Sequence, residues 1–216
     1  MKPADIATLA RGERTRQSIL DAAEALFSAE NYDAISIRNV ADRAGVKFGL
    51  ITYHFKNKEN LFEAVATRKS LEITRRRTEL LEALEAPGVN GILDAFMRPV
   101  VELLPLPEWR PYLRLISAIG GDPRWNWLAE KLFRDNSMTF VVALEKVMPG
   151  VPEEAIVRGF SYALSVLAGM TQYGAAMNVL TIESYATDDY QRIYATMLPF
   201  VTGGMEAIAE AHRARS

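Results

Sequence analysis

The chain of 216 residues contains no cysteine and only two histidines. The absence of cysteine excludes disulfides, thiol nucleophiles and thiolate metal sites, and it suits a reducing compartment. The first ten residues also lack the apolar core of a signal peptide. We therefore expect a cytoplasmic protein. Because histidine is scarce and no metal-ligand spacing occurs, we expect neither an enzyme nor a metal or other cofactor.

A strong net charge is also missing. The formal charge is −2 at pH 7, whereas a DNA-contacting domain is often strongly basic. The residues up to Leu84 hold 14 Lys and Arg against 12 Asp and Glu, and the rest hold 11 against 15. This polarity has the direction expected of an N-terminal nucleic-acid binder, but it is small, so charge alone does not identify one.

One uncharged stretch, from Gly159 to Ile182, is long enough to cross a bilayer. Polar side chains such as Ser161, Ser165 and Gln172 interrupt it, and they favour burial between protein surfaces over exposure to lipid. We therefore expect no association with a membrane.

Helical periodicity runs through nearly the whole chain. Apolar residues recur at helical spacing, few segments alternate with period two, and glycine, proline or asparagine divides the pattern. The sequence predicts an all-α fold of about nine helices. After a first helix that ends near residue 31, the expected helices cover residues 37–44, 47–53, 58–84, 91–104, 110–119, 123–147, 153–177 and 188–211.

Two short helices near the N-terminus are joined by a tight turn. Ser36 is a good N-cap for the first of them, and Gly45 permits the turn before the second. Helix-turn-helix units of this kind place their second helix in the DNA major groove, although the same spacing also occurs in ordinary helical corners. The spacing therefore indicates a DNA-binding unit without proving one.

Four sequence segments strengthen this interpretation: ILDAAEALF at residues 19–27, SIRNVA at 36–41, AGV at 44–46 and YHFKNKE at 53–59. Together they resemble the N-terminal domain of the TetR (tetracycline repressor) family, from about Arg14 to Val65. The C-terminal two-thirds share only the helical layout. The resemblance implies an N-terminal three-helix helix-turn-helix domain, a C-terminal helical domain for ligand binding and dimerisation, and a transcriptional regulator whose usual action is repression.

The matched segments carry hydrogen-bond donors suited to DNA phosphates. Tyr53, His54 and Lys58 lie where the third helix ends and the fourth begins, and Ser36 and Arg38 open the second helix. Anions are favoured near a helix N-terminus, and matching positions in the TetR family contact the DNA backbone. The alternative is that Tyr53 fills the core, His54 is an ordinary surface residue and Lys58 is solvated.

The front of the third helix is expected to read bases. Lys47 suits guanine O6 and N7, Phe48 suits a thymine methyl group, and Gly49 allows close approach to DNA. These residues depart from the family pattern, in which a small hydroxyl residue is usual at position 47 and a tyrosine is common where Thr52 stands. The predicted DNA-binding residues are Ser36, Arg38, Lys47, Phe48, Gly49, Thr52, Tyr53, His54 and Lys58.

We assign residues 1–58 to an N-terminal tail and the DNA-binding domain, and residues 59–216 to an effector-binding and dimerisation domain. A single fourth helix that begins at Lys58 and runs some 25 residues would span about 40 Å and link the two domains mechanically.

Two later helices carry features of a dimer interface. Ser161, Ser165 and Gly169 recur every four residues along the uncharged helix and allow another helix to approach closely. The last helix would complete a four-helix bundle across a homodimer, as in TetR-like proteins. Its apolar residues are Tyr190, Ile193, Met197, Phe200, Val201 and Ile208. The alternative is that both helices pack only within the monomer.

Large side chains in the C-terminal part suggest a pocket for an apolar or amphipathic small-molecule effector. The candidates are Phe96, Trp109, Tyr112, Leu115, Ile116, Phe133, Met170 and Tyr173, each of which also suits a plain hydrophobic core. Arg98 and Arg114 are candidates to meet an effector carboxylate, or else they are solvated or ion-paired. The run from Arg75 to Arg77 is expected to be a solvated helix face.

The sequence thus predicts a sequence-specific DNA-binding transcriptional regulator. The more specific prediction is a ligand-responsive repressor that binds a palindromic double-stranded operator as a homodimer. A helical small-molecule-binding protein without DNA binding is the alternative.

Overall fold

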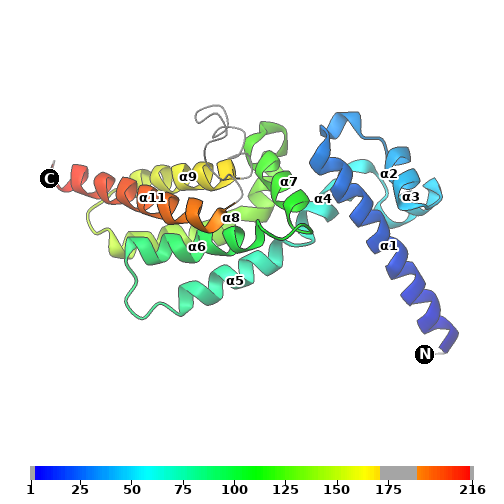
Figure 1. Cartoon of the computed structure of the whole chain (residues 1–216), viewed down its shortest axis with the longest axis horizontal. Helices are drawn as coiled ribbons and strands as arrows, with labels where there is room; N and C mark the ends of the chain where they lie inside the picture. The colour runs from blue at the N-terminus through cyan, green and yellow to red at the C-terminus, as the bar shows by residue number, and fades with distance from the viewer. Residues whose placement is uncertain (1–2, 171–188, 215–216) are drawn as a thin grey trace.

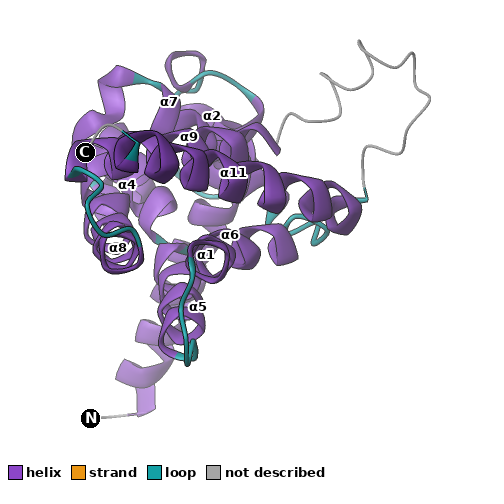
Figure 2. Cartoon of the chain, turned by 90° about the vertical axis from the view of Figure 1, so that its left-hand side faces the viewer, coloured by secondary structure: helices purple, strands orange, loops and turns teal. Residues whose placement is uncertain are grey.

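The structure is a computed structural model, and it describes residues 3–170 and 189–214. Helices and loops make up all of that part, which contains no strand (Figure 2), so the predicted all-α fold is confirmed. The helices are α1 (Pro3–Ala29), α2 (Ile37–Ala44), α3 (Phe48–Phe55), α4 (Lys58–Thr67), α5 (Ser70–Glu82), α6 (Val89–Leu103), α7 (Arg110–Gly121), α8 (Asn126–Val147), α9 (Glu153–Gly169) and α11 (Tyr190–Arg213), with short 3₁₀ helices η1 (Tyr32–Ala34) and η2 (Pro123–Trp125).

The helices form two groups along the long axis of the molecule (Figure 1). One end holds α1 to α4, the other holds α5, α6, α8, α9 and α11, and α7 lies between them. Each group has its own hydrophobic core, the N-terminal core in the first group and the C-terminal core in the second. Because Leu115 and Ile119 of α7 belong to the core of the first group, the two ends are joined by packed side chains as well as by the chain itself.

Local signals build the helix-turn-helix as the sequence predicts. Ser36 Oγ accepts a hydrogen bond from the Asn39 amide at 3.1 Å, and Asn39 Oδ1 accepts one from the Ser36 amide at 2.8 Å, so the two residues form a capping box. Gly45 ends α2 with a φ of 65°, a left-handed conformation that strains residues with a side chain. Asn57 caps α4 by accepting the Asn60 amide.

The predicted single helix over residues 58–84 is wrong, because the structure divides it into α4 and α5. At the break, the Ala66 carbonyl accepts a hydrogen bond from the buried Tyr112 hydroxyl of α7 at 2.8 Å. In a continuous helix this carbonyl would serve the amide four residues later. A contact from a residue distant in the sequence thus replaces helical bonding at a place that no glycine or proline marks.

Glu24 of α1 ties this break to the first group of helices. Glu24 is only 5% exposed, and its carboxylate lies between Arg68 and Lys69, with N to O distances of 2.6 and 2.8 Å. Arg68 also pairs with Asp21, and Lys69 donates a hydrogen bond to the Glu108 carbonyl at 2.8 Å. The short segment between α4 and α5 is therefore held by α1 and by the connection between α6 and α7.

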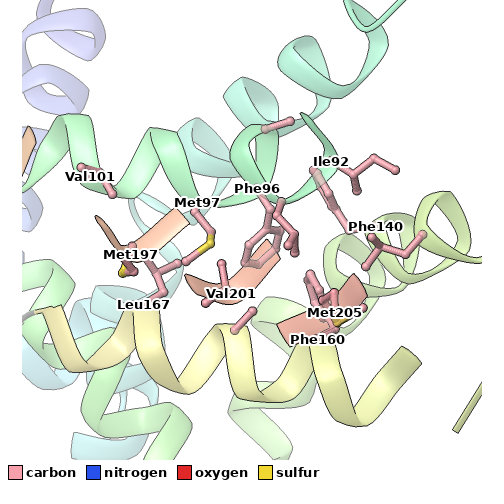
Figure 3. Packing of buried hydrophobic residues seen from close by; sticks show 14 of the residues in the cluster. Ile92, Phe96, Met97, Val101, Phe140, Phe160, Leu167, Met197, Val201 and Met205 are labelled. Carbon is pink, nitrogen blue, oxygen red and sulfur yellow. The ribbon is translucent and has the colours of Figure 1, made fainter. Parts of the chain in front are cut away.

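The second core lies among α6, α8, α9 and α11, and Figure 3 shows its side chains pointing toward one another. Phe96 of α6 meets Phe140 and Phe160 edge to face, with ring centroids 5.0 and 4.9 Å apart. Gly159 lets α9 approach α11 closely, because a Cβ atom there would lie 2.3 Å from Met205 Sδ. Packing of this kind depends on residues far apart in the sequence.

The predicted helix over residues 153–177 is described as α9 up to Gly169, and its end lies outside the described residues. Within the part that the structure covers, no helix combines the length and the apolar character needed to span a bilayer.

Candidate nucleic-acid interface and effector region

Helix α3 buries one face against its neighbours and leaves the other in solvent. Ile51 and Phe55 form the buried face. The exposed face carries Lys47, Phe48, Gly49, Thr52 and Tyr53, which are five of the six residues predicted here to read bases or approach phosphates; the sixth, His54, is half-buried. The structure therefore brings these five residues onto one accessible surface.

Two aromatic rings stand out on that surface, since Phe48 is 51% exposed and Tyr53 is 80% exposed. The alternative that Tyr53 fills the core is thus wrong. Its ring meets the half-buried His54 edge to face, with ring centroids 5.1 Å apart. A tyrosine held in this way keeps its hydroxyl free for an external acceptor such as a phosphate oxygen.

Two predicted phosphate donors are engaged within the protein. Lys58 Nζ donates a hydrogen bond to the Tyr32 carbonyl and lies 3.9 Å from the centroid of the Tyr32 ring. Burial lowers the pKa of Lys58, and the Asp33 carboxylate partly opposes this effect. Ser36 Oγ donates to Asn39 Oδ1 at 2.5 Å. Each of these groups must exchange its present partner in order to donate to a phosphate.

Arg38 and Lys56 are two further exposed cations of the N-terminal helices. Arg38 is exposed on the first turn of α2, and a side chain that donates to a phosphate must be accessible in this way. Lys56 is exposed where α3 ends, in an unusual backbone conformation with a φ of 66°. Sequence reasoning passed over Lys56, although its position between the donor residues Tyr53 and Lys58 was a signal.

The side chains predicted to line one effector pocket do not lie together. Phe96, Trp109, Tyr112 and Met170 belong to the C-terminal core, Leu115 and Phe133 belong to the N-terminal core, Ile116 contacts both cores, and Tyr173 lies outside the described residues. Aromatic and aliphatic content does not reveal which core a helix face enters, and the single effector pocket stays a prediction.

Two surface grooves are present elsewhere. One, of about 780 Å³, lies between α1 and α2, where Arg14 and Arg43 are among its lining residues. The other, of about 650 Å³, lies between α5 and α8 and is lined by Leu81, Met138 and Val142 among others. Neither groove is lined by the residues predicted to form the effector pocket.

The run of three arginines on α5 is only partly a solvated face. Arg75 and Arg76 are exposed and pair with Glu79. Arg77 turns inward, so the prediction is wrong for this residue. Its Nε donates a hydrogen bond to the Phe96 carbonyl at 2.8 Å, because α5 packs directly against α6.

The other candidate arginines lie at the surface. Arg98 pairs with Asp94 of its own helix, and this hydrogen bond raises the pKa of Arg98. Arg114 is exposed on α7.

The predicted dimer face is divided between the interior and the surface. Ile193, Met197 and Val201 of α11 are buried within the chain, so they do not belong to an external interface. Tyr190 and Ile208 are half-buried. The remaining predicted residues are exposed on adjoining helices, namely Ser161, Ser165 and Gly169 on α9 and Phe200 on α11.

Comparison with known proteins agrees with this geometry. The family model described as bacterial regulatory proteins, tetR family, matches residues 19–65, and the model of a tetracyclin repressor-like C-terminal domain matches residues 94–204. The transcriptional repressor AcnR of Corynebacterium glutamicum is 27% identical over 127 residues, which are 57% of this chain and 62% of AcnR. The transcriptional regulator SrpR of Pseudomonas putida is 38% identical over 115 residues, which are 53% of this chain and 51% of SrpR.

Among solved structures, the ketosteroid transcriptional regulator KstR2 of Mycobacterium tuberculosis superposes with a TM-score of 0.61. The superposition covers 88% of this chain and 93% of KstR2 at 16% sequence identity, so it shows a shared fold. The sequence matches to AcnR and SrpR, by contrast, span only about half to three-fifths of those proteins' length.

A capped helix-turn-helix with an exposed second helix defines a DNA-binding protein of the helix-turn-helix class. The model of the C-terminal domain alone matches half of the chain, so the family itself is identified. The chain belongs to the TetR family of bacterial transcriptional regulators. A small-molecule carrier without DNA binding is therefore not favoured.

Proposed function

We propose that the protein is a ligand-responsive repressor that binds a palindromic operator as a homodimer and leaves the DNA when a small molecule binds. The exposed face of α3, with Phe48 and Tyr53 in solvent, is the observation that carries the proposal. Its support comes from large apolar rings beside the cationic Lys47, an arrangement suited to a groove that offers methyl groups and acceptor atoms. Such a protein acts on chromosomal DNA, so we propose a cytoplasmic location.

The proposed residue roles follow from this surface. Lys47 and Phe48 read base edges, while Gly49 and Thr52 lie against the DNA. Tyr53, His54 and Lys58 hold one phosphate group, and Ser36 and Arg38 hold another. To reach its phosphate, Lys58 leaves the Tyr32 carbonyl. Burial at the present position destabilises the ammonium cation and lowers the pKa of Lys58, so a move toward a phosphate anion is favoured.

The proposed domains remain residues 1–58 for DNA binding and 59–216 for effector binding and dimerisation. Helix α4 serves both, because its Leu61 and Phe62 pack in the N-terminal core while it leads directly into α5. In the proposed mechanism, an effector that binds one dimer state more tightly moves α4 and so changes the spacing of the two α3 helices. Half-sites about 34 Å apart would then no longer be matched.

Recovery of bound duplexes from a random DNA library tests the proposal. The expected result is a palindrome with half-sites one helical turn apart. In the same assay, Lys58→Ala should weaken binding to all sequences and flatten its salt dependence, whereas Lys47→Ala should relax base preference. Equal operator affinity for both variants and the parent would contradict the proposed interface.

A further inference from the structure

Lys58, a proposed phosphate contact, is held by the short helix η1. Its ammonium group donates a hydrogen bond to the Tyr32 carbonyl and lies 3.9 Å from the centroid of the Tyr32 ring. Burial lowers the pKa of Lys58 and the Asp33 carboxylate opposes this effect, so the charge of Asp33 is felt at the ammonium group. The position and charge of η1 therefore govern how readily Lys58 can turn to a phosphate.

A residue of the proposed effector domain neutralises this carboxylate. Arg124 of η2, between α7 and α8, pairs with Asp33 across 91 positions of the sequence, with Nη1 2.6 Å from Oδ2. Asp122 holds the same guanidinium by an ion pair at 2.8 Å and caps η2 by accepting the Arg124 amide at 3.0 Å. Arg124 thus occupies the Asp33 carboxylate while Lys58 bonds to the neighbouring carbonyl.

Aromatic rings pack η1 against η2 at the same place. The Tyr32 ring meets Trp125 edge to face, with ring centroids 4.7 Å apart. The Trp125 ring centroid also lies 4.5 Å from that of Phe62 on α4, and Trp125 is only 8% exposed. Because closely packed side chains transmit displacement, a shift of η2 reaches both η1 and α4.

Helix α7 connects this joint with the C-terminal core. The helix lies between the two groups of helices (Figure 1), and its Tyr112 belongs to the C-terminal core while its Ile119 belongs to the N-terminal core. Ser117 also donates a hydrogen bond to the Ala168 carbonyl of α9 at 3.3 Å. Since η2 begins two residues after α7 ends, a ligand that moves α7 also moves Arg124.

These observations deepen the proposed function and rest on it. We propose that Arg124 is a positioning residue for Lys58, through which the effector domain controls DNA binding. With Arg124 on Asp33, Lys58 bonds to a neutral carbonyl and can exchange it for a phosphate oxygen. When Arg124 is withdrawn, Asp33 takes Lys58 as its ion-pair partner and the phosphate contact is lost.

An exchange of exposed ion pairs suits a switch because it costs little. The side chains of Arg124 and Asp33 are 54% and 72% exposed, and exposed ion pairs contribute little to stability. A modest difference in the effector's affinity for the two arrangements is therefore enough to shift their populations. The consequence for DNA binding is larger, because both protomers of the proposed homodimer lose a charged hydrogen bond.

Operator binding tests the exchange, with the operator recovered from the random library. Arg124→Gln should bind about ten-fold more weakly than the parent, because each protomer loses a hydrogen bond between charged groups. Addition of Asp33→Asn to Arg124→Gln should restore the affinity, because asparagine has no charge with which to capture Lys58. In the Lys58→Ala protein, Arg124→Gln should cause little further loss.

The double variant separates a positioning role from two others. Asp33→Asn breaks the same ion pair as Arg124→Gln, so a purely structural ion pair would give a loss in both single variants and no restoration. If Arg124 itself donated to a phosphate, the loss would persist in the double variant. Either result would overturn the proposal.

Lys131→Gln is the matched control. Lys131 is an exposed cation of α8 that pairs with Glu63 of α4, so it also joins the proposed effector domain to the helix that Lys58 begins. Its substitution should leave operator affinity unchanged. An equal loss in Lys131→Gln and Arg124→Gln would show that any ion pair at this junction has the same effect, which contradicts a specific role of Arg124.

Titration of Lys58 by NMR tests the exchange without DNA. The pKa of Lys58 should rise in Arg124→Gln, because the released Asp33 carboxylate stabilises the ammonium cation, and Asp33→Asn should abolish this increase. An unchanged pKa of Lys58 in Arg124→Gln would overturn the proposal.

The two measurements together separate this proposal from the proposed function. If the protein binds an operator but Arg124→Gln changes neither operator affinity nor the pKa of Lys58, the positioning role fails and the regulator remains. If the pKa of Lys58 changes as expected but no DNA sequence is bound selectively, the proposed repressor fails while the exchange of ion pairs at Asp33 is supported.

Discussion

The two ends of the molecule both expose aromatic side chains, but the residues around these side chains differ. At the DNA-binding end, Phe48 and Tyr53 project from α3 beside the exposed Lys47. At the other end, Tyr162 of α9 and Phe200 of α11 are 62% and 72% exposed on adjoining helices. Near Tyr162 and Phe200 the helices carry small residues, as expected where another helix approaches. At the DNA-binding end, a cation lies beside the aromatic rings, which suits the binding of a polyanion.

The ends also differ in what determines their structure. In the first, the Ser36 cap and the Gly45 turn lie close in sequence and define α2 and the turn that leads into α3. In the second, the shape of the core depends on contacts such as Gly159 against Met205. Glu24 joins these two kinds of structure, because it lies on α1 and binds the segment between α4 and α5. Four substitutions test the comparison.

Glu24→Gln should have the largest effect. It leaves Arg68 and Lys69 without their shared carboxylate, and removal of one partner from a buried ion pair is expected to cost about 3 kcal/mol of unfolding free energy. Chemical denaturation measures the change. The exposed Glu30→Gln, just beyond the end of the same helix, is the control and should change stability by less than about 0.5 kcal/mol. Equal stability of the two variants would contradict the role of Glu24 as the link.

Phe200→Asp should separate the two ends functionally. In the proposed homodimer, a charge on the exposed face of α11 opposes dimerisation, so sedimentation should show a monomer, and operator affinity should fall about a hundred-fold because the second half-site is no longer held nearby. Leu71→Asp is the control, since Leu71 is 77% exposed on α5, away from α9 and α11. A dimer that survives Phe200→Asp would exclude this face as the interface.

Gly159→Val should destabilise the C-terminal core by about 2 kcal/mol, because the added side chain enters space held by Met205 and Ile208. Gly120→Val on α7 is the control, because a Cβ atom added there would meet nothing within 4 Å. Thermal unfolding should show a lower melting temperature for Gly159→Val alone. Similar melting temperatures for both would mean that α9 and α11 can separate at little cost.

Ser36→Ala should have the smallest effect, a loss of about 1 kcal/mol from the removal of one N-cap. The effect should be local, so hydrogen exchange should accelerate in α2 and α3 and stay unchanged in α9. Thr15→Ala is the control, because its hydroxyl only bonds back to the Arg11 carbonyl within α1. Faster exchange at both ends would show that the two cores unfold together.

Much of the helical pattern could be predicted because its signals are local. Ser36 and Gly45 mark the bounds of α2, and the turn residue needs its left-handed conformation whatever surrounds it. The orientation of side chains at exposed or half-exposed positions was harder. Arg77 and Lys58 both suit a solvated helix by their chemistry, yet each turns toward a carbonyl of another element.

The sequence by itself determined the all-α class, the helix-turn-helix and the family, since periodicity, caps and spaced motifs act over a few residues. Only the tertiary structure decided where the helix is interrupted between α4 and α5, which of the three consecutive arginines of α5 turns inward, and which large side chains enter which core. These features depend on Tyr112, Glu24 and Phe96, which lie far along the chain from the residues that they contact. Periodicity records which face of a helix is apolar, but not which partner will cover it.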